Sequence, residues 1–99
     1  MTDSAGNPAP GPLKRTLAIA NKRGLHARAA AKFVRTAGQF DAAVRVSFKG
    51  QDVSGLSIMG LMMLAAGIGS SIELSCSGRQ AFEAMTALSA LVEGKFGED

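Results

Sequence analysis

Residues 71–77 read SIELSCS, and this stretch decides the fold because apolar and polar residues alternate along it. Ile72, Leu74 and Cys76 share one side, and only polar residues occupy the other. Such alternation predicts a strand with one face buried and one face in water. The following residues, 79–95, predict the longest helix because their apolar residues recur at helical spacing. That stripe consists of Ala81, Ala84, Met85, Leu88, Leu91 and Val92.

Alternation of the same kind predicts two earlier strands, at residues 13–20 and 44–48. Lys49-Gly50 predicts a tight turn into a return strand at 51–54, because glycine tolerates positive φ.

Two further helices are predicted between these strands. The first begins at Ala27 and ends at Gly38, a residue that favours helix termination. A short helix follows at residues 57–64, where Ser57 supplies an N-cap. The buried face of the first helix is expected to consist of Ala27, Ala30, Ala31, Val34 and Ala37.

The resulting element order is β-α-β-β-α-β-α. Amphipathic helices are enough to cover one face of a sheet whose other face meets water. We therefore predict an α+β fold, an open-faced two-layer sandwich with a four-stranded, mostly antiparallel sheet.

The composition leaves few ways to do chemistry. The chain has 99 residues, enough for one domain, with one histidine, one cysteine and neither Trp nor Tyr. His26 and Cys76 are too few ligands for a metal cage, so we expect no metal and no cofactor. Cys76 is expected to be a core residue, and a lone cysteine fits the reducing cytoplasm. By elimination, His26 is the leading nucleophile or base.

Residues 1–12 contain all three prolines and little apolar surface, so they predict a disordered tail before a domain at 13–99. This tail lacks the basic and apolar regions of a signal peptide. No apolar run approaches the roughly 20 residues that span a bilayer, so no membrane association is expected.

Positive charge is concentrated in one part of the chain. Between Lys14 and Arg45 there are eight basic residues and one acidic residue, Asp41. A solvated basic face explains this pattern as well as an acidic protein partner or a bound phosphate does. Nucleic acid is not expected, because the chain has neither Tyr nor Trp to stack on bases.

His26 lies in GLHAR, directly before the first predicted helix. The helix end carries unpaired N–H groups and a partial positive charge, which favour a neutral, nucleophilic imidazole. A phosphoryl group on this ring would sit over the N–H of Ala27 and its successors, and Arg28 could add a charge-assisted hydrogen bond. Position alone equally allows an ordinary capping or surface histidine.

Two separate segments resemble one known family. NKRGLHARAAAKFV, residues 21–34, resembles the active-site stretch of HPr, the histidine-containing phosphocarrier of the bacterial phosphoenolpyruvate-dependent sugar phosphotransferase system. SIMGLMMLAAGIGSSIEL, residues 57–74, resembles the segment of that family that contains a regulatory serine. The resemblance covers about residues 13–96, with both motifs in register.

The resemblance implies a function for the chain. His26 would accept a phosphoryl group on Nδ1 from Enzyme I, which phosphoenolpyruvate charges, and would pass it to a histidine of an Enzyme IIA protein. Arg28 matches the family's arginine that contacts the phosphoryl group. Ser57 matches the serine that an HPr kinase/phosphorylase modifies in many bacteria, although Ser57 could equally be only a helix cap. Such a protein would be a monomeric carrier rather than a stand-alone enzyme.

Two positions depart from the family pattern. Ala29 stands where the family usually has proline, which leaves the first helical turn less rigid. Leu56 stands where lysine is common before the regulatory serine, which removes a charge that a kinase could read. Phosphorylation at Ser57 is therefore less well supported than transfer at His26.

Partner docking is expected to combine charge and apolar contact. Beside Arg28, the basic residues near His26 would meet acidic partner surfaces. Part of the methionine-rich 57–64 segment would form an adaptable apolar surface, and part would belong to the core. The docking residues we expect are Arg23, Lys32, Ile58, Met59, Leu61 and Met62.

The main alternative is a regulatory binding module. Nitrogen-type phosphotransfer chains without a sugar permease also contain HPr-like proteins, which act by binding targets according to their phosphorylation state. The chemistry at His26 would be the same, and the output would be regulation.

Overall fold

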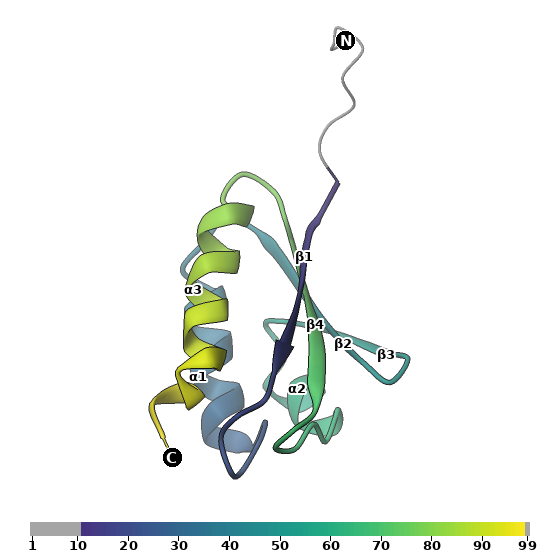
Figure 1. Cartoon of the computed structure of the whole chain (residues 1–99). Helices are drawn as coiled ribbons and strands as arrows, with labels where there is room; N and C mark the ends of the chain where they lie inside the picture. Colours follow the sequence, from purple (N-terminus) through teal and green to yellow (C-terminus); the bar gives the residue numbers. More distant parts are fainter. Residues whose placement is uncertain (1–10, 99) are drawn as a thin grey trace, which may run out of the picture.

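The computed structural model describes residues 11–98. They form a four-stranded antiparallel sheet in the order β1-β4-β2-β3, and the long helices pack on one of its faces (Figure 1). The predicted α+β open-faced sandwich is confirmed. The predicted tail at residues 1–12 lies outside the described residues, except for Gly11 and Pro12, which are exposed.

The elements follow the predicted order. The strands are β1 (Leu13–Ala18), β2 (Ala43–Phe48), β3 (Gln51–Ser54) and β4 (Ser71–Ser77). The helices are α1 (Ala27–Ala37), α2 (Ile58–Met63) and α3 (Ala81–Glu93), and a 3-10 turn, η1 (Lys95–Gly97), follows α3. The predicted tight turn between β2 and β3 is also present, because Lys49 and Gly50 both have positive φ, at 49° and 80°. None of the helices in residues 11–98 is long and apolar enough to cross a membrane.

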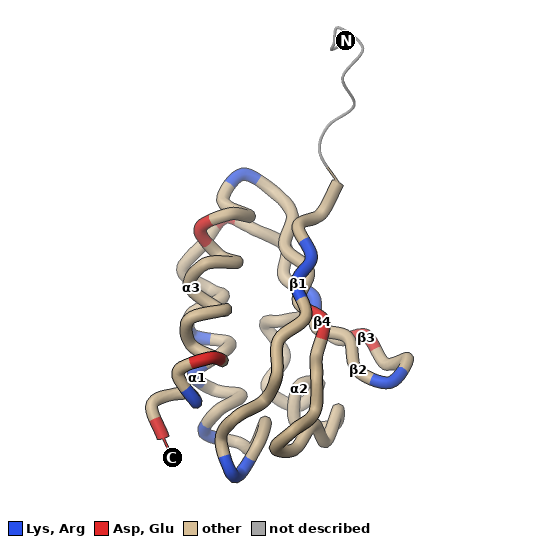
Figure 2. The backbone as a smooth tube through the Cα atoms, viewed as in Figure 1, with Lys and Arg blue, Asp and Glu red and all other residues tan. Residues whose placement is uncertain are grey.

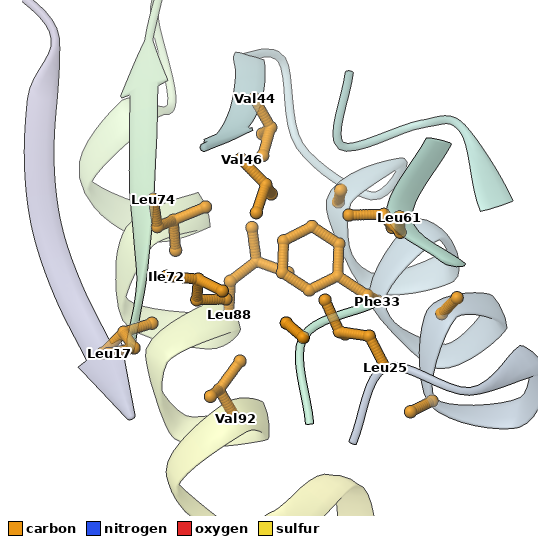
Figure 3. Packing of buried hydrophobic residues seen from close by; sticks show 14 of the residues in the cluster. Leu17, Leu25, Phe33, Val44, Val46, Leu61, Ile72, Leu74, Leu88 and Val92 are labelled. Carbon is orange, nitrogen blue, oxygen red and sulfur yellow. The ribbon is translucent and has the colours of Figure 1, made fainter. Parts of the chain in front are cut away.

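The core lies between the sheet and the helices (Figure 3). Ile72, Leu74 and Cys76 of β4 point into it and are at most 1% exposed, as the alternation predicted. Burial raises the pKa of the Cys76 thiol, so Cys76 is a packing residue rather than a reactive one.

The buried face of α1 differs from the prediction. The buried residues are Ala29, Ala30, Phe33 and Ala37, whereas Ala27 is exposed. Phe33 is fully buried and packs among Leu25, Leu61 and the strands (Figure 3). A phenylalanine removes far more apolar surface from water than an alanine does, so it sets the rotation of the helix.

Candidate functional site

His26 occupies the N-cap position of α1, with an extended backbone (φ −75°, ψ 178°). Its side chain does not cap the helix, and the first helical hydrogen bond runs from the N–H of Ala30 to the His26 carbonyl, at 2.9 Å. No acceptor among the described residues takes the N–H groups of Ala27, Arg28 or Ala29. Unpaired donors therefore remain at the helix end beside the imidazole.

The loop before α1 holds His26 in place. Gly24 has φ +63°, and a Cβ there would lie 2.4 Å from the Ala66 carbonyl oxygen, so this position needs glycine. The Leu25 N–H donates to the same oxygen at 3.0 Å. Asn21, which is fully buried, donates from Nδ2 to the Gly24 carbonyl at 2.9 Å. These contacts fix the loop against the segment that follows α2.

A carboxylate from the far end of the chain reaches this loop. The two oxygens of Glu98 lie 2.9 and 3.0 Å from Nε2 of His26, and Asn21 Nδ2 donates to Glu98 Oε1 at 3.0 Å. The side chains of His26 and Glu98 are only 17% and 19% exposed. The hydrogen bond from Asn21, with further contributions from His26 and the charge of Lys32, lowers the pKa of the Glu98 carboxyl.

The ionised carboxylate determines which imidazole nitrogen carries the proton. A carboxylate can only accept hydrogen bonds, so Nε2 of His26 must be the protonated nitrogen in this contact. In the neutral ring Nδ1 then has the free lone pair, and no described residue hydrogen bonds to Nδ1. The geometry therefore leaves Nδ1 as the ring nitrogen with an unengaged lone pair among the described contacts.

Basic side chains line a cavity next to Glu98, the residue that contacts His26. Lys22, Arg23, Arg28 and Glu98 line a cavity of about 280 Å³. Basic positions gather on the 21–26 loop and the start of α1, at the lower end of Figure 2. The predicted residues Arg23 and Arg28 are therefore at the site. Lys32 instead donates from Nζ to the Phe96 carbonyl, at 2.6 Å, and is partly buried.

One predicted docking residue is wrong. Leu61 is fully buried and belongs to the core, because it is the residue of α2 that faces α1 and the sheet. The other three apolar docking residues are exposed as expected: Ile58 is 40%, Met59 68% and Met62 38% exposed. Three further large apolar side chains, within α2 or within five residues of its ends, are also exposed. We call the exposed set the apolar patch, and it comprises Leu56, Ile58, Met59, Met62, Met63 and Ile68.

Ser57 caps α2, as predicted. Its Oγ accepts a hydrogen bond from the Gly60 N–H at 2.9 Å, and the residue is partly buried. Leu56 stands where the family commonly has lysine. Because Leu56 is 57% exposed, the surface beside Ser57 lacks the positive charge that a lysine would place there. Ala29, where the family has proline, is fully buried in the first turn of α1.

Sequence reasoning did not identify Asn21 or Glu98 as site residues. Asn21 lies within the quoted 21–34 motif, and an asparagine before Lys-Arg-Gly is a recognisable turn signal. Glu98 carries no local signal, because 72 residues separate it from His26.

The chain is thus an open-faced sandwich with one histidine at the start of its first helix, and the glutamate that contacts this histidine also lines a cavity with three basic residues. The family model described as "PTS HPr component phosphorylation site" matches residues 13–94. The phosphocarrier protein HPr of Cupriavidus necator is 52% identical over 86 residues, which cover 87% of this chain and 97% of that protein. The chain belongs to the HPr family of phosphocarriers of the phosphotransferase system.

Solved structures and a second group of relatives agree with this assignment. The crystal structure of an HPr from Thermoanaerobacter tengcongensis matches with a TM-score of 0.84 and 44% identity, covering 88% of this chain and 98% of that one. A phosphocarrier protein NPr of Shewanella violacea is 43% identical over 86 residues, which cover 87% of this chain and 94% of that protein.

Proposed function

We propose that this protein carries a phosphoryl group on Nδ1 of His26, received from phospho-Enzyme I and passed to a histidine of an Enzyme IIA protein. The observation that carries the proposal is the contact between Glu98 and Nε2 of His26, at 2.9 and 3.0 Å. It leaves the lone pair of Nδ1 available at the end of α1, and Glu98 also lines a cavity with Lys22, Arg23 and Arg28. Membership of the HPr family supports the same role.

In the transfer step, the Nδ1 lone pair attacks phosphorus as the bond between phosphorus and the donor breaks. The proton on Nε2 stays there, and the electron pair of the broken bond leaves with the donor, so no other reactant is needed. Glu98 holds the resulting positive ring through Nε2. The phosphate oxygens would meet Arg28 and the unpaired N–H groups from Ala27 onward.

The basic cavity and the apolar patch support docking at the same end of the molecule. The 21–26 loop contacts the segment after α2 through the hydrogen bond from Leu25 to Ala66. A partner that covers His26 would therefore also meet α2, with Arg23 at an acidic surface and Met59 in an apolar contact. Flexible methionines suit a surface that several proteins must grip.

The decisive experiment incubates the protein with Enzyme I and labelled phosphoenolpyruvate. We expect an acid-labile, base-stable label on the wild type and none on His26→Ala. Arg35→Ala is the matched control, because Arg35 is an exposed basic residue on α1 that does not line the cavity. Absence of label on the folded wild-type protein would overturn the proposal.

Regulation is the second candidate function, and the similarity to the NPr of Shewanella violacea supports it. In that case the chemistry at His26 is retained, and targets bind according to its phosphorylation state. Sugar uptake requires an Enzyme IIA that hands the phosphoryl group to a permease, whereas a regulatory chain ends at the bound target. Transfer from the labelled protein to the organism's own Enzyme IIA proteins distinguishes the two outputs.

Ser57 is proposed as a second phosphorylation site, because it matches the family's regulatory serine. A phosphate at the start of α2 would place negative charge beside the apolar patch and hinder docking. Ser57→Asp is therefore expected to slow the labelling of His26 by Enzyme I, with Ser54→Asp in β3 as the matched control. Unchanged labelling would leave Ser57 with its capping role alone.

A further inference from the structure

The chain reverses direction after α3 through a strained turn. Lys95, Phe96 and Gly97 have φ values of 60°, 56° and 73°. This left-handed region is unfavourable for residues that carry a Cβ, and only Gly97 lacks one. The conformation of η1 therefore depends on contacts with the rest of the molecule.

Two contacts hold this turn. The Phe96 side chain is 1% exposed and belongs to the core. The Phe96 carbonyl accepts a hydrogen bond from Lys32 Nζ at 2.6 Å, and a Cβ built on Gly97 would lie 3.5 Å from the same nitrogen. Lys32 lies on α1, the helix that His26 begins, so its ammonium ties the turn directly to the helix of the site.

The turn carries the residue that contacts His26. Glu98 follows η1 immediately, and its N–H donates to the Lys95 carbonyl at 2.9 Å. Only one residue separates the carbonyl that Lys32 holds from Glu98. We therefore expect a change at that carbonyl to shift the carboxylate relative to Nε2 of His26.

We propose that Lys32 is a positioning residue: by holding the Phe96 carbonyl it keeps the Glu98 carboxylate on Nε2 of His26 and so maintains the tautomer with a free Nδ1. The consequence for catalysis rests on the proposed function, in which Nδ1 is the nucleophile. Lys32 thus acts inside the molecule, in addition to any contact with a partner.

The test compares Lys32→Met with three other variants. Methionine retains an apolar stem without the ammonium, whereas Lys32→Arg keeps a donor. Lys22→Met is the matched control, because it removes one positive charge from the cavity that Glu98 lines, and Lys22 does not hydrogen bond to η1. Glu98→Ala removes the carboxylate itself, and it shows how far the tautomer ratio of His26 changes when the contact is lost completely.

The readout is the ratio of the two neutral tautomers of His26, measured by nitrogen-15 NMR at a pH that keeps the ring neutral. Glu98→Ala is expected to lower the ratio of Nε2–H to Nδ1–H by about tenfold, the factor that corresponds to one hydrogen bond to a charged group. Lys32→Met is expected to lower it at least about threefold and to speed amide exchange at Glu98. Lys32→Arg and Lys22→Met are expected to stay near the wild-type ratio.

Three outcomes would overturn the proposal: a wild-type ratio in Lys32→Met, an unchanged ratio in Glu98→Ala, or equal shifts in Lys32→Met and Lys22→Met. Neither measurement uses phosphotransfer. A wild-type protein that takes no label from Enzyme I would therefore overturn the carrier function while leaving the positioning by Lys32 intact.

Discussion

Glu98 contacts Nε2 of His26 through both carboxylate oxygens, at 2.9 and 3.0 Å. The pairing joins two residues that are 72 positions apart and places a negative charge on the side of the ring away from Nδ1. It therefore selects the tautomer, and in the proposed transfer it also offers a counter-charge to the positive ring.

The first prediction concerns the acid titration of Glu98. Its pKa is lowered, chiefly by the Asn21 hydrogen bond, so Glu98 is expected to titrate below the ordinary glutamate value of about 4.3. A carboxyl with a lowered folded-state pKa stabilises the protein above its ordinary pKa, and this contribution is lost as the pH falls through the lowered value. Carbon-13 NMR of the Glu98 carboxyl measures it directly.

Asn21→Ala is the matched variant for that titration. Because it removes the largest favourable contact, it is expected to move the Glu98 titration back toward the ordinary value. A wild-type protein in which Glu98 titrates at the ordinary value would contradict the contact.

The second prediction concerns Gly24. Gly24→Ala is expected to lower the free energy of unfolding by about 1–3 kcal/mol or more, because positive φ and the Ala66 carbonyl both oppose a Cβ there. Gly67→Ala, at a glycine with open space around its Cβ position, is expected to change it by less than about 0.5 kcal/mol. Urea denaturation measures both, and equal effects would contradict the close approach of the two loops.

The third prediction separates the core side of α2 from its exposed side. Leu61→Ala is expected to cost about 2–5 kcal/mol of stability, because it empties a fully buried site. Met59→Ala, at a residue that is 68% exposed, is expected to leave stability unchanged and to slow labelling by Enzyme I. A loss of stability in Met59→Ala, or unchanged labelling, would contradict the role of the apolar patch.

The fourth prediction concerns the departure at Ala29. Its N–H has no acceptor among the described residues, so Ala29→Pro is expected to change the free energy of unfolding by less than about 1 kcal/mol. Arg35→Pro, at an exposed position in the last turn of the same helix, removes an N–H that lies far enough along the helix to have an intrahelical acceptor, and it is expected to cost about 3 kcal/mol. Thermal unfolding measures both. Similar losses of stability would show that the Ala29 N–H does have an acceptor, contrary to the structure.

Local sequence patterns were sufficient to predict the order of the strands and helices in this chain. Alternation in residues 71–77 depends only on neighbours along the strand, so the burial of Ile72, Leu74 and Cys76 follows from it. The rotation of α1 required one more consideration, the size of Phe33, which outweighs the alanines that a count of apolar spacing favours. The burial of Leu61 could not be predicted in this way. The helix α2 is short and apolar on all sides, so the spacing of its apolar residues does not show which side faces the sheet.

The sequence by itself determined the strand and helix order, the position of His26 at a helix start and the family of the chain, because each depends on residues close together or on matched motifs. The resemblance implied Nδ1 as the reacting atom, and only the tertiary structure shows what leaves that ring nitrogen free. The free nitrogen is set by Glu98, which contacts Nε2. The left-handed turn at residues 95–97 brings Glu98 to the ring, and a hydrogen bond from Lys32 to the Phe96 carbonyl holds that turn. A hydrogen bond across 72 residues exists only once α1 and α3 have packed, and no local pattern encodes it.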